Sequence, residues 1–254
     1  NIVEASIFDQ HKIKELFENT NICINLVGIS YEKKNINTFE NIHSIFPSYL
    51  AKLSKDNNLE QFIHLSALGI NEAVDSKYAK SKLDGEKNIL KNYPSATILR
   101  PSIVYSVDDN FTTNLMSLTS ILPIFPLYYS GNTKFMPIHC TDLIEIIFHV
   151  ISKNIDSNII ECVGPETLTF KEIIKKLLKN INKKRLLIPL PLPIAVLSSK
   201  FFQIFPKPLL TEDQLRLLKY DNILSGRYKN NSDLGIPSLK FFDEEVKKYS
   251  YMWK

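Results

Sequence analysis

The chain has 254 residues, of which 44% are hydrophobic and 23% are charged. A chain of this length and apolar content can bury one sizeable core, with or without a small accessory lobe, which argues against intrinsic disorder. The formal net charge is +4, and the lysines are scattered rather than interleaved with aromatic residues on one face. A nucleic-acid-binding protein is therefore not expected.

Short apolar runs alternate with helical patterns in the first hundred residues. The patterns predict helices over residues 11–18, 38–55 and 76–91, and strands over residues 21–28, 61–66 and 97–105. This alternation is typical of a parallel sheet covered by helices. We therefore predict an α/β fold with a Rossmann-like, doubly wound sheet.

The pattern becomes looser after Tyr105 and passes into a stretch rich in proline and aromatic residues, residues 122–139, where we expect loops. It becomes regular again at Asp142, which is predicted to cap an apolar helix over residues 143–151. A strand is expected over residues 158–164, and no internal repeat is visible.

Thr169 and Glu172 have the spacing of a capping box for a helix over residues 170–181. This helix begins a C-terminal part that lacks the strand and helix alternation of the first half. We predict a nucleotide-binding domain without its first strands, and a smaller C-terminal lobe. The predicted domain comprises residues 1–107 and 141–164, and the lobe comprises residues 108–140 and 165–254.

Residues 186–210 form the most apolar part of the chain. Their five prolines leave about a dozen residues for a helix, which is short of the ~20 residues that span a bilayer. If this segment is exposed, it forms an adhesive surface. If it is buried, it lines a ligand cleft or contacts a partner.

Tyr78, Lys82 and Ser66 have the arrangement of a nicotinamide-dependent reduction site. Tyr78 and Lys82 are four residues apart and share one helix face, while Ser66 ends an apolar strand, at the edge where open parallel sheets bind ligands. A nearby ammonium favours the phenolate, so we expect Lys82 to lower the pKa of Tyr78. A Tyr-x-x-x-Lys pair also arises by chance among eleven tyrosines, so the succession of strand, serine, helix and strand carries the prediction.

The three cysteines, Cys23, Cys140 and Cys162, have neither a metal-binding spacing nor a disulfide pattern. We expect reduced, buried thiols. His139 and Asp142 flank Cys140, but a second ligand pair is lacking, so a turn at the end of a strand is expected and no metal site is predicted.

Four further polar residues have two possible interpretations each. His64 is expected to be structural, with a catalytic role as the alternative. Asp108 and Asp109 belong either to a solvated loop or to a carboxylate pair. Glu86 follows the site lysine by one helical turn, and we expect it to balance that charge from outside the cleft.

The order of short motifs along the chain resembles the extended or atypical short-chain dehydrogenase/reductase superfamily. Within it, the chain is similar to the family of the mitochondrial complex I 39 kDa subunit and its bacterial relatives. The motifs are NLVG, HLSALG, YAKSK, ILRPSIVY, VGPE, IPLPLP, LTEDQL and YMWK. They extend over nearly the whole chain, and their order is more specific than any one of them.

The resemblance implies catalytic roles for Ser66, Tyr78, Lys82 and Asn41, an asparagine that helps to organise the proton path in many members. It implies NADP or NAD as cofactor, with NADP slightly favoured. The implied cofactor contacts are Leu26, Val27, Gly28, Ser66, Tyr78, Lys82, Pro101, Ser102 and Ile103.

The seven glycines are spread along the chain and do not form the glycine-rich turn that receives the pyrophosphate in this superfamily. By the resemblance, Asn1 falls near the third strand of the sheet. We therefore expect the first strand, the turn and the following helix to lie upstream of it. Without that turn, weak binding of a dinucleotide is expected.

The leading prediction is an NAD(P)(H)-binding protein of the complex I 39 kDa-like family, in which the cofactor is mainly structural. Its implied partners are respiratory complex I subunits and a membrane surface. The implied location is peripheral, on the cytoplasmic face of a bacterial inner membrane or on the mitochondrial matrix side. The alternative is an NAD(P)-dependent reductase, dehydrogenase or epimerase that acts on a small hydrophobic, quinone- or isoprenoid-like substrate through Ser66, Tyr78 and Lys82.

Overall fold

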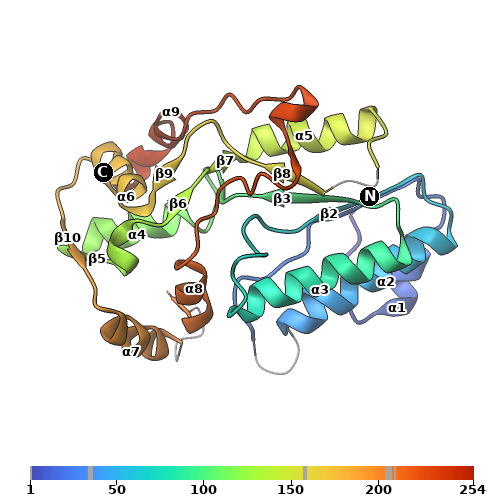
Figure 1. Ribbon diagram of the computed structural model, residues 1–254, viewed down its shortest axis with the longest axis horizontal. Coiled ribbons are helices and arrows are strands. Elements are labelled where there is room, and N and C mark those ends of the chain that lie inside the picture. The colour runs from blue at the N-terminus through green and yellow to red at the C-terminus, as the bar shows by residue number, and fades with distance from the viewer. Residues whose placement is uncertain (1, 34–36, 157–158, 204–207, 209) are drawn as a thin grey trace.

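A five-stranded sheet forms the centre of the larger part of the molecule in the computed structural model (Figure 1). The structure describes the chain except for residues 1, 34–36, 157–158, 204–207 and 209. Every neighbouring pair of strands in this sheet is parallel. This confirms the predicted Rossmann-like α/β fold. In spatial order the strands are β1 (Ile22–Asn25), β2 (Gln61–Leu65), β3 (Thr97–Pro101), β8 (Ile159–Cys162) and β11 (Lys229–Asn230).

Helices cover both faces of this sheet (Figure 1). On one face lie α1 (Gln10–Glu15), α2 (Phe46–Asp56) and α3 (Lys77–Asn92), and their apolar side chains form a core with Phe62 of β2. On the other face α5 (Cys140–Ser152) packs against the next side chain of β2, Ile63. Successive side chains of a strand point to opposite faces, so each strand contributes to both cores.

The helix predicted over residues 38–55 is present but is divided into η1 (Asn41–Ile45), a π-helical turn, and α2. Pro47 explains the division. A proline has no N–H to donate to the carbonyl four residues earlier, here that of His43, and its ring crowds that carbonyl. The wider turn relieves this crowding, and Phe46 N donates to Asn41 O instead.

The strand predicted over residues 97–105 is two separate strands. β3 ends at Pro101, and β4 (Val104–Tyr105) pairs with β7 (Ile138–His139) rather than with the central sheet. The change of partner occurs at Ser102 and Ile103.

The smaller part of the structure packs around its own apolar core, to which Met116, Phe125, Leu127, Ile173 and Leu177 contribute. It lies at one end of the long axis of the molecule (Figure 1). Its elements are α4 (Thr112–Ile121), β5 (Ile124–Leu127), η2 (Tyr128–Gly131), β6 (Lys134–Phe135), β9 (Leu168–Thr169), α6 (Phe170–Asn180), β10 (Leu186–Pro189), α7 (Leu192–Phe202), α8 (Glu212–Leu217), α9 (Phe242–Lys247) and η4 (Ser250–Trp253). The short η3 (Ser232–Leu234) instead packs against the core under α5. β11 also comes from residues 165–254, yet it extends the central sheet beside β8.

The sequence patterns missed α4. Its serine and threonine residues are weak helix formers, and no helix was predicted there. Asp109 supports the start of this helix, because its carboxylate accepts hydrogen bonds from the backbone N–H groups of Phe111 (2.6 Å) and Thr112 (2.5 Å). Asp109 is therefore a capping residue.

The capping box at α6 is confirmed, since Thr169 Oγ1 accepts from Glu172 N at 3.2 Å and Glu172 Oε2 accepts from Thr169 N at 2.7 Å. The predicted cap of α5 is wrong. His139 precedes the helix and its Nδ1 accepts from Thr141 N, whereas Asp142 lies in the first turn and accepts from Lys240 N at 3.1 Å.

Residues 186–210 form β10 and α7, as far as the described residues extend. β10 pairs in parallel with β5. Leu186, Leu192, Ile194 and Leu197 are all more than half exposed. In the described part of the chain, no helix combines the length and apolar character needed to cross a bilayer.

All three cysteines are free, as expected, but of these only Cys162 is buried.

Candidate functional site

Lys82 is the centre of the candidate site. Ser76 begins α3 by accepting a hydrogen bond from Ala79 N, and the helix then carries Lys82 against the carboxyl end of β2. There the ammonium donates to Leu65 O at 3.0 Å, and the residue is 4% exposed. A Cβ added to Gly28, after the end of β1, would lie 3.6 Å from Lys82 Nζ. The structure thus brings Lys82 together with Gly28 and the end of β2.

Burial lowers the pKa of Lys82 to about 8, although the carboxylate of Glu86 opposes this change. Burial removes water from the ammonium and disfavours the charged form. At neutral pH Lys82 remains a cation. Among the described residues its ammonium has Leu65 O as its hydrogen-bond acceptor, which leaves further N–H groups available for a ligand.

His43 was missed in the sequence, because a single histidine inside a helical pattern carries no signal of its own. It lies on η1, is fully buried, and joins three segments. Its Nε2 accepts from Ile29 N at 3.1 Å, so its Nδ1 carries the proton and donates to Ser81 Oγ at 3.0 Å. Ser81 in turn donates to Tyr78 O at 2.8 Å. Burial, with a smaller effect from the charge of Lys82, lowers the pKa of His43 to about 3, so the ring is neutral.

Tyr78 is partly buried among aromatic rings. His43 and Phe39 both meet its ring edge-on, at centroid distances of 5.1 Å and 5.7 Å, and they stack on each other at 5.4 Å. Burial raises the pKa of Tyr78 to about 12. The expectation that Lys82 lowers this pKa is therefore wrong, because burial removes water from the phenol and disfavours its charged form.

Ser66 lies directly after β2 and is 6% exposed. Its backbone N–H donates to Leu99 O at 2.7 Å, while its Oγ has no hydrogen-bond partner among the described residues. His64, two residues earlier, accepts from Asn25 Nδ2 through its Nδ1 at 3.0 Å. Burial lowers the pKa of His64, and this pairing fits a structural role for the neutral ring.

The other predicted cofactor residues lie at the same edge of the sheet. Leu26 and Val27 are exposed after the end of β1. Pro101 ends β3 and its carbonyl accepts from Leu68 N, close to Ser66. Ile103 packs partly against the core of the smaller part.

Ser102 is bonded within the protein. Its hydroxyl donates to Asn222 Oδ1 at 2.6 Å and accepts from Met136 N at 3.2 Å. Asn222 also donates to Leu68 O at 2.6 Å, and thus connects the segments that follow β2 and β3. Asn222 was missed because it is distant in sequence from everything it contacts.

Asn41 lies on the same π-helical turn as His43, and its backbone N–H donates to Thr38 Oγ1.

Glu86 is buried in the protein and acts on the charge of Lys82, as expected. It forms a bidentate, buried ion pair with Arg100 of β3, with distances of 2.5 Å and 2.9 Å. The Arg100 guanidinium also lies 4.6 Å from the ring centroid of Tyr228. The charge of Lys82 is thus balanced from inside the protein by a carboxylate that is already held by an arginine.

Asp213 of α8 connects the smaller part to the helix of the site. Its carboxylate accepts from Lys77 N at 2.7 Å, from Ser76 Oγ at 2.8 Å and from Tyr78 N at 3.0 Å. These donors form the N-terminus of α3, where a negative charge is stabilising. The position of Tyr78 therefore depends on α8.

These residues fit the ribose and nicotinamide end of a dinucleotide. A buried ammonium with free N–H groups suits ribose hydroxyls, and the unpartnered hydroxyl of Ser66 suits a carbonyl or hydroxyl group. Both lie at the carboxyl edge of a parallel sheet, where such ligands bind. Among the described residues, no cluster of histidine, cysteine and carboxylate side chains is arranged to hold a metal ion.

The sequence is similar to subunits of mitochondrial complex I. NADH dehydrogenase [ubiquinone] 1 alpha subcomplex subunit 9 of Mus musculus is 28% identical over 255 residues, which cover 96% of this chain and 66% of the mouse protein. The Dictyostelium discoideum protein of the same name is 32% identical over 174 residues, covering 68% of this chain and 48% of that protein. The chain thus spans two thirds or less of the length of these relatives. No protein-family model matches it.

A shorter similarity extends to an enzyme. The ceramide reductase of Caulobacter vibrioides is 35% identical over 82 residues, which are 32% of this chain and 26% of that protein.

Solved structures share the fold at low sequence identity. The UDP-glucuronic acid 4-epimerase of Bacillus cereus, in complex with NAD, superposes with a TM-score of 0.72 at 17% identity, covering 99% of this chain and 82% of the epimerase. The dTDP-glucose 4,6-dehydratase of Bacillus anthracis gives a TM-score of 0.70 at 13% identity, covering 99% and 78%. The chain is therefore similar in sequence to these subunits of mitochondrial complex I, and it has the fold of the NAD-bound epimerase and dehydratase structures.

Proposed function

We propose that the protein binds NAD(P)(H) as a mainly structural cofactor and assembles with respiratory complex I subunits at a membrane surface. NADP is slightly favoured over NAD by the family resemblance. The proposed location is peripheral, on the cytoplasmic face of a bacterial inner membrane or on the matrix side of a mitochondrial one. The similarity to complex I subunits supports the proposed partners.

The buried ammonium of Lys82 carries the cofactor proposal. It is fixed by Leu65 O beside the unpartnered hydroxyl of Ser66, and Gly28 leaves space next to it. Lys82 is proposed to donate to the ribose hydroxyls. Leu26 to Gly28 and Pro101 to Ile103 are proposed to border the cofactor on either side of Ser66.

The state of Tyr78 favours a structural cofactor. A bound nicotinamide supplies a hydride donor or acceptor, and a reductase needs a nearby acid or base that changes its protonation readily. With its pKa raised to about 12, Tyr78 is a neutral phenol that releases its proton less readily than a free tyrosine. Its ring is held by His43 and Phe39, which suits a fixed boundary of the cofactor site.

The proposal is tested on the natural protein, extracted from its source membrane in a mild detergent. Native gel electrophoresis measures whether it migrates with respiratory subunits, and extraction followed by mass spectrometry identifies bound nucleotide. We expect both. A protein that migrates alone and holds no nicotinamide nucleotide would contradict the proposal.

A reductase that acts on a hydrophobic carbonyl compound is the second candidate, and the similarity to ceramide reductase favours it. In that case Tyr78 would give its proton to the substrate oxygen and Ser66 would orient that oxygen, while a bound nicotinamide would supply the hydride. Replacing Tyr78 by Phe in the natural protein distinguishes the two candidates. A structural protein keeps its nucleotide and its assembly, whereas a reductase loses turnover with a long-chain ketone.

A further inference from the structure

Two unusual surface features lie together at the end of the molecule formed by α6, β5 and β10 (Figure 1). One is an exposed apolar face on the two-stranded sheet β5–β10. The other is a hollow lined mainly by lysines on α6 and on the segment between α6 and β10. Neither belongs to the candidate cofactor site.

The apolar face follows from strand alternation. Phe125 and Leu127 of β5 point into the core, so Ile124 points outward, and its partner in register on β10 is Leu186. Ile124, Leu186 and Ile188 are 49%, 60% and 39% exposed. Ile121, at the end of α4 just before β5, is 80% exposed. A group of aliphatic side chains exposed in this way marks an interaction site more often than a scattered surface leucine does.

The hollow has a volume of about 550 Å³ and is strongly cationic. Lys171, Lys175 and Lys179 are spaced four residues apart and share the outer face of α6. No carboxylate is among the lining residues that the structure describes. The lining consists of Lys171, Lys175, Leu178, Lys179, Lys183, Lys184, Arg185 and Leu187.

Among the described residues, ion pairs neutralise little of this charge, although the carboxylate of Glu172 on the same helix acts electrostatically on Lys175. Lys179 pairs with Asp243 at 3.8 Å, and the Arg185 guanidinium donates to the carbonyls of Thr119 and Ser120 at the end of α4. The other four lysines of the hollow make no ion pair within the described part of the chain. A chain with a net charge of only +4 thus concentrates positive charge beside its exposed apolar strands.

We infer that this surface, formed by β5, β10 and the lysine hollow of α6, binds an anionic phospholipid bilayer. Aliphatic side chains enter the boundary between headgroups and acyl chains, while lysines extend along it toward anionic headgroups. A free anion would need the lysines but not the apolar strands, and an apolar protein partner would not need the lysines. The inference rests on the membrane location in the proposed function and names its lipid partner.

Vesicle sedimentation tests the charge. The 254-residue chain is mixed with vesicles of phosphatidylcholine alone, or with phosphatidylglycerol added, at about 0.1 M and about 1 M salt, where the Debye lengths are about 10 Å and about 3 Å. We expect binding to the anionic vesicles at the lower salt, and binding about tenfold or more weaker at the higher salt or without phosphatidylglycerol.

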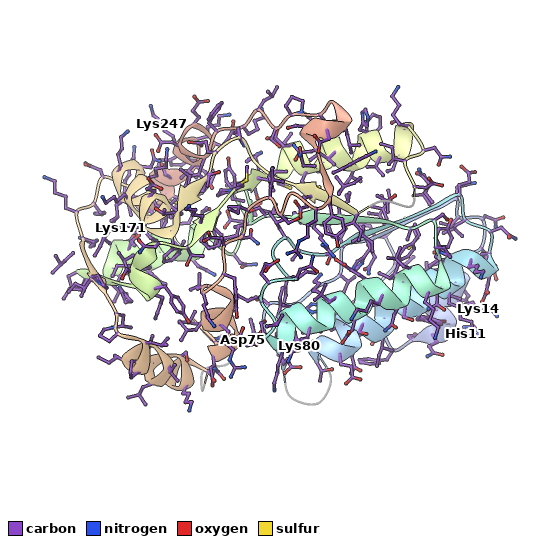
Figure 2. The ribbon with its side chains drawn as sticks, viewed as in Figure 1. His11, Lys14, Asp75, Lys80, Lys171 and Lys247 are labelled. Atoms are coloured by element: carbon purple, nitrogen blue, oxygen red, sulfur yellow. The ribbon has the colours of Figure 1, made fainter. Side chains whose placement is uncertain are left out.

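Replacing Lys171, Lys175, Lys183 and Lys184 together by Gln is expected to weaken binding to the anionic vesicles about tenfold or more. The matched control replaces four exposed lysines of the other helices, and Figure 2 shows one of them, Lys14, at the opposite end of the molecule from Lys171. The control lysines are Lys14, Lys52, Lys55 and Lys91, and this variant is expected to bind as the wild type does.

The apolar face has its own pair of variants. Leu186→Ser with Ile188→Ser is expected to weaken binding at both salt concentrations. The control pair, Ile144→Ser with Phe148→Ser, removes an aliphatic and an aromatic side chain of α5 that are 57% and 69% exposed, and it is expected to have no effect. Thermal unfolding of each variant verifies that it is folded.

Equal binding to neutral and anionic vesicles would overturn the inference, as would equal losses in the lysine variant and its control. Absence of vesicle binding by the wild type would do the same. Nucleotide content is a separate measurement on the natural protein, so a protein that keeps its nucleotide but fails to bind vesicles overturns this inference and leaves the cofactor proposal standing.

Discussion

His43 and Lys82 are two titratable side chains buried next to each other, and the protein keeps one neutral and the other charged. The backbone N–H of Ile29 and the hydroxyl of Ser81 bond both nitrogens of the neutral imidazole. The ammonium of Lys82 donates a hydrogen bond to the carbonyl of Leu65. The carboxylate of Glu86, further away, also favours its charged form. Their different pKa changes thus come from different neighbours, although burial acts on both.

His43 should make the protein sensitive to acid. Its pKa is about 3 in the folded protein and near 6.5 when unfolded, so only the unfolded chain takes up its proton between these values. The stabilising effect of keeping the ring neutral is complete above pH 6.5. Below that pH, the free energy of unfolding should fall by up to about 1.4 kcal/mol per pH unit from this residue.

Urea unfolding at several pH values checks this prediction. His43→Gln should make the pH dependence below 6.5 shallower, and the same change at exposed His11 should leave it as in the wild type. The same slope in the two variants and the wild type would show that His43 is not responsible.

Lys82 should make cofactor affinity depend on pH in the alkaline range. Its pKa is about 8, so raising the pH above this value removes the charge proposed to strengthen hydrogen bonds to ribose hydroxyls. The dissociation constant of NADPH, measured by calorimetry between pH 7 and 9.5, is expected to rise. Lys82→Met should bind weakly at every pH, while Lys80→Met on the exposed face of the same helix should behave as the wild type. A flat pH profile for the wild type would contradict this role.

At the scale of elements, the position of α3 is set by close contacts to two neighbours. A Cβ on Gly85 would lie 1.8 Å from His43 O, so this glycine allows α3 and η1 to approach closely. Two turns of the helix contribute Lys82 and Glu86, and Glu86 joins the helix to β3 through Arg100. The π-helical turn and the buried ion pair together fix Tyr78 and Lys82 relative to the sheet.

Breaking the ion pair should destabilise the protein strongly. Glu86→Gln leaves the Arg100 guanidinium buried without its counter-ion, and the expected loss is about 3–5 kcal/mol of unfolding free energy. The double variant Glu86→Leu, Arg100→Met removes both charges and should be closer to the wild type. Denaturant unfolding measures both.

An exposed ion pair on the same helix is the control. Asp84 and Lys87 lie 3.5 Å apart on the surface, so Asp84→Asn should cost less than about 1 kcal/mol. If Glu86→Gln costs no more than this control, the buried pair does not hold α3 in place.

At the scale of the whole molecule, α8 connects the two parts of the structure. Asp213 reaches from α8 to the N-terminus of α3, and Gln214 Nε2 donates to Ser30 O at 3.4 Å after the end of β1. Asn222 connects the ends of β2 and β3 from the same C-terminal region. The smaller part therefore borders the candidate site as well as carrying the proposed membrane surface.

Asp213→Ala should loosen this connection. Three donors at the start of α3 lose their acceptor, and the expected cost is roughly 1–3 kcal/mol. Hydrogen exchange at the amides of Lys77 and Tyr78 should become faster, while that of the central strands should not. The control is Asp75→Ala, which removes an exposed carboxylate 3.8 Å from Lys219 and should leave these amides protected. Unchanged exchange in Asp213→Ala would show that α8 does not hold the helix.

The sequence by itself determined the order of strands and helices in the first hundred residues, the shared face of Tyr78 and Lys82, and the capping box at Thr169. These features depend on residues within about one or two turns of each other, so local periodicity and hydrogen bonding specify them. It failed at α4, where a distant packing surface and the Asp109 cap outweigh poor helix formers.

Only the tertiary structure decided the surroundings of the site. His43 and Arg100 meet α3 from distant parts of the chain, and burial raises the pKa of Tyr78 although Lys82 lies one helical turn away. It also decided that Leu186 and its neighbours are exposed beside the lysines of α6. The physical reason is that burial and electrostatic environment depend on which distant segments pack together, and short sequence patterns do not record this.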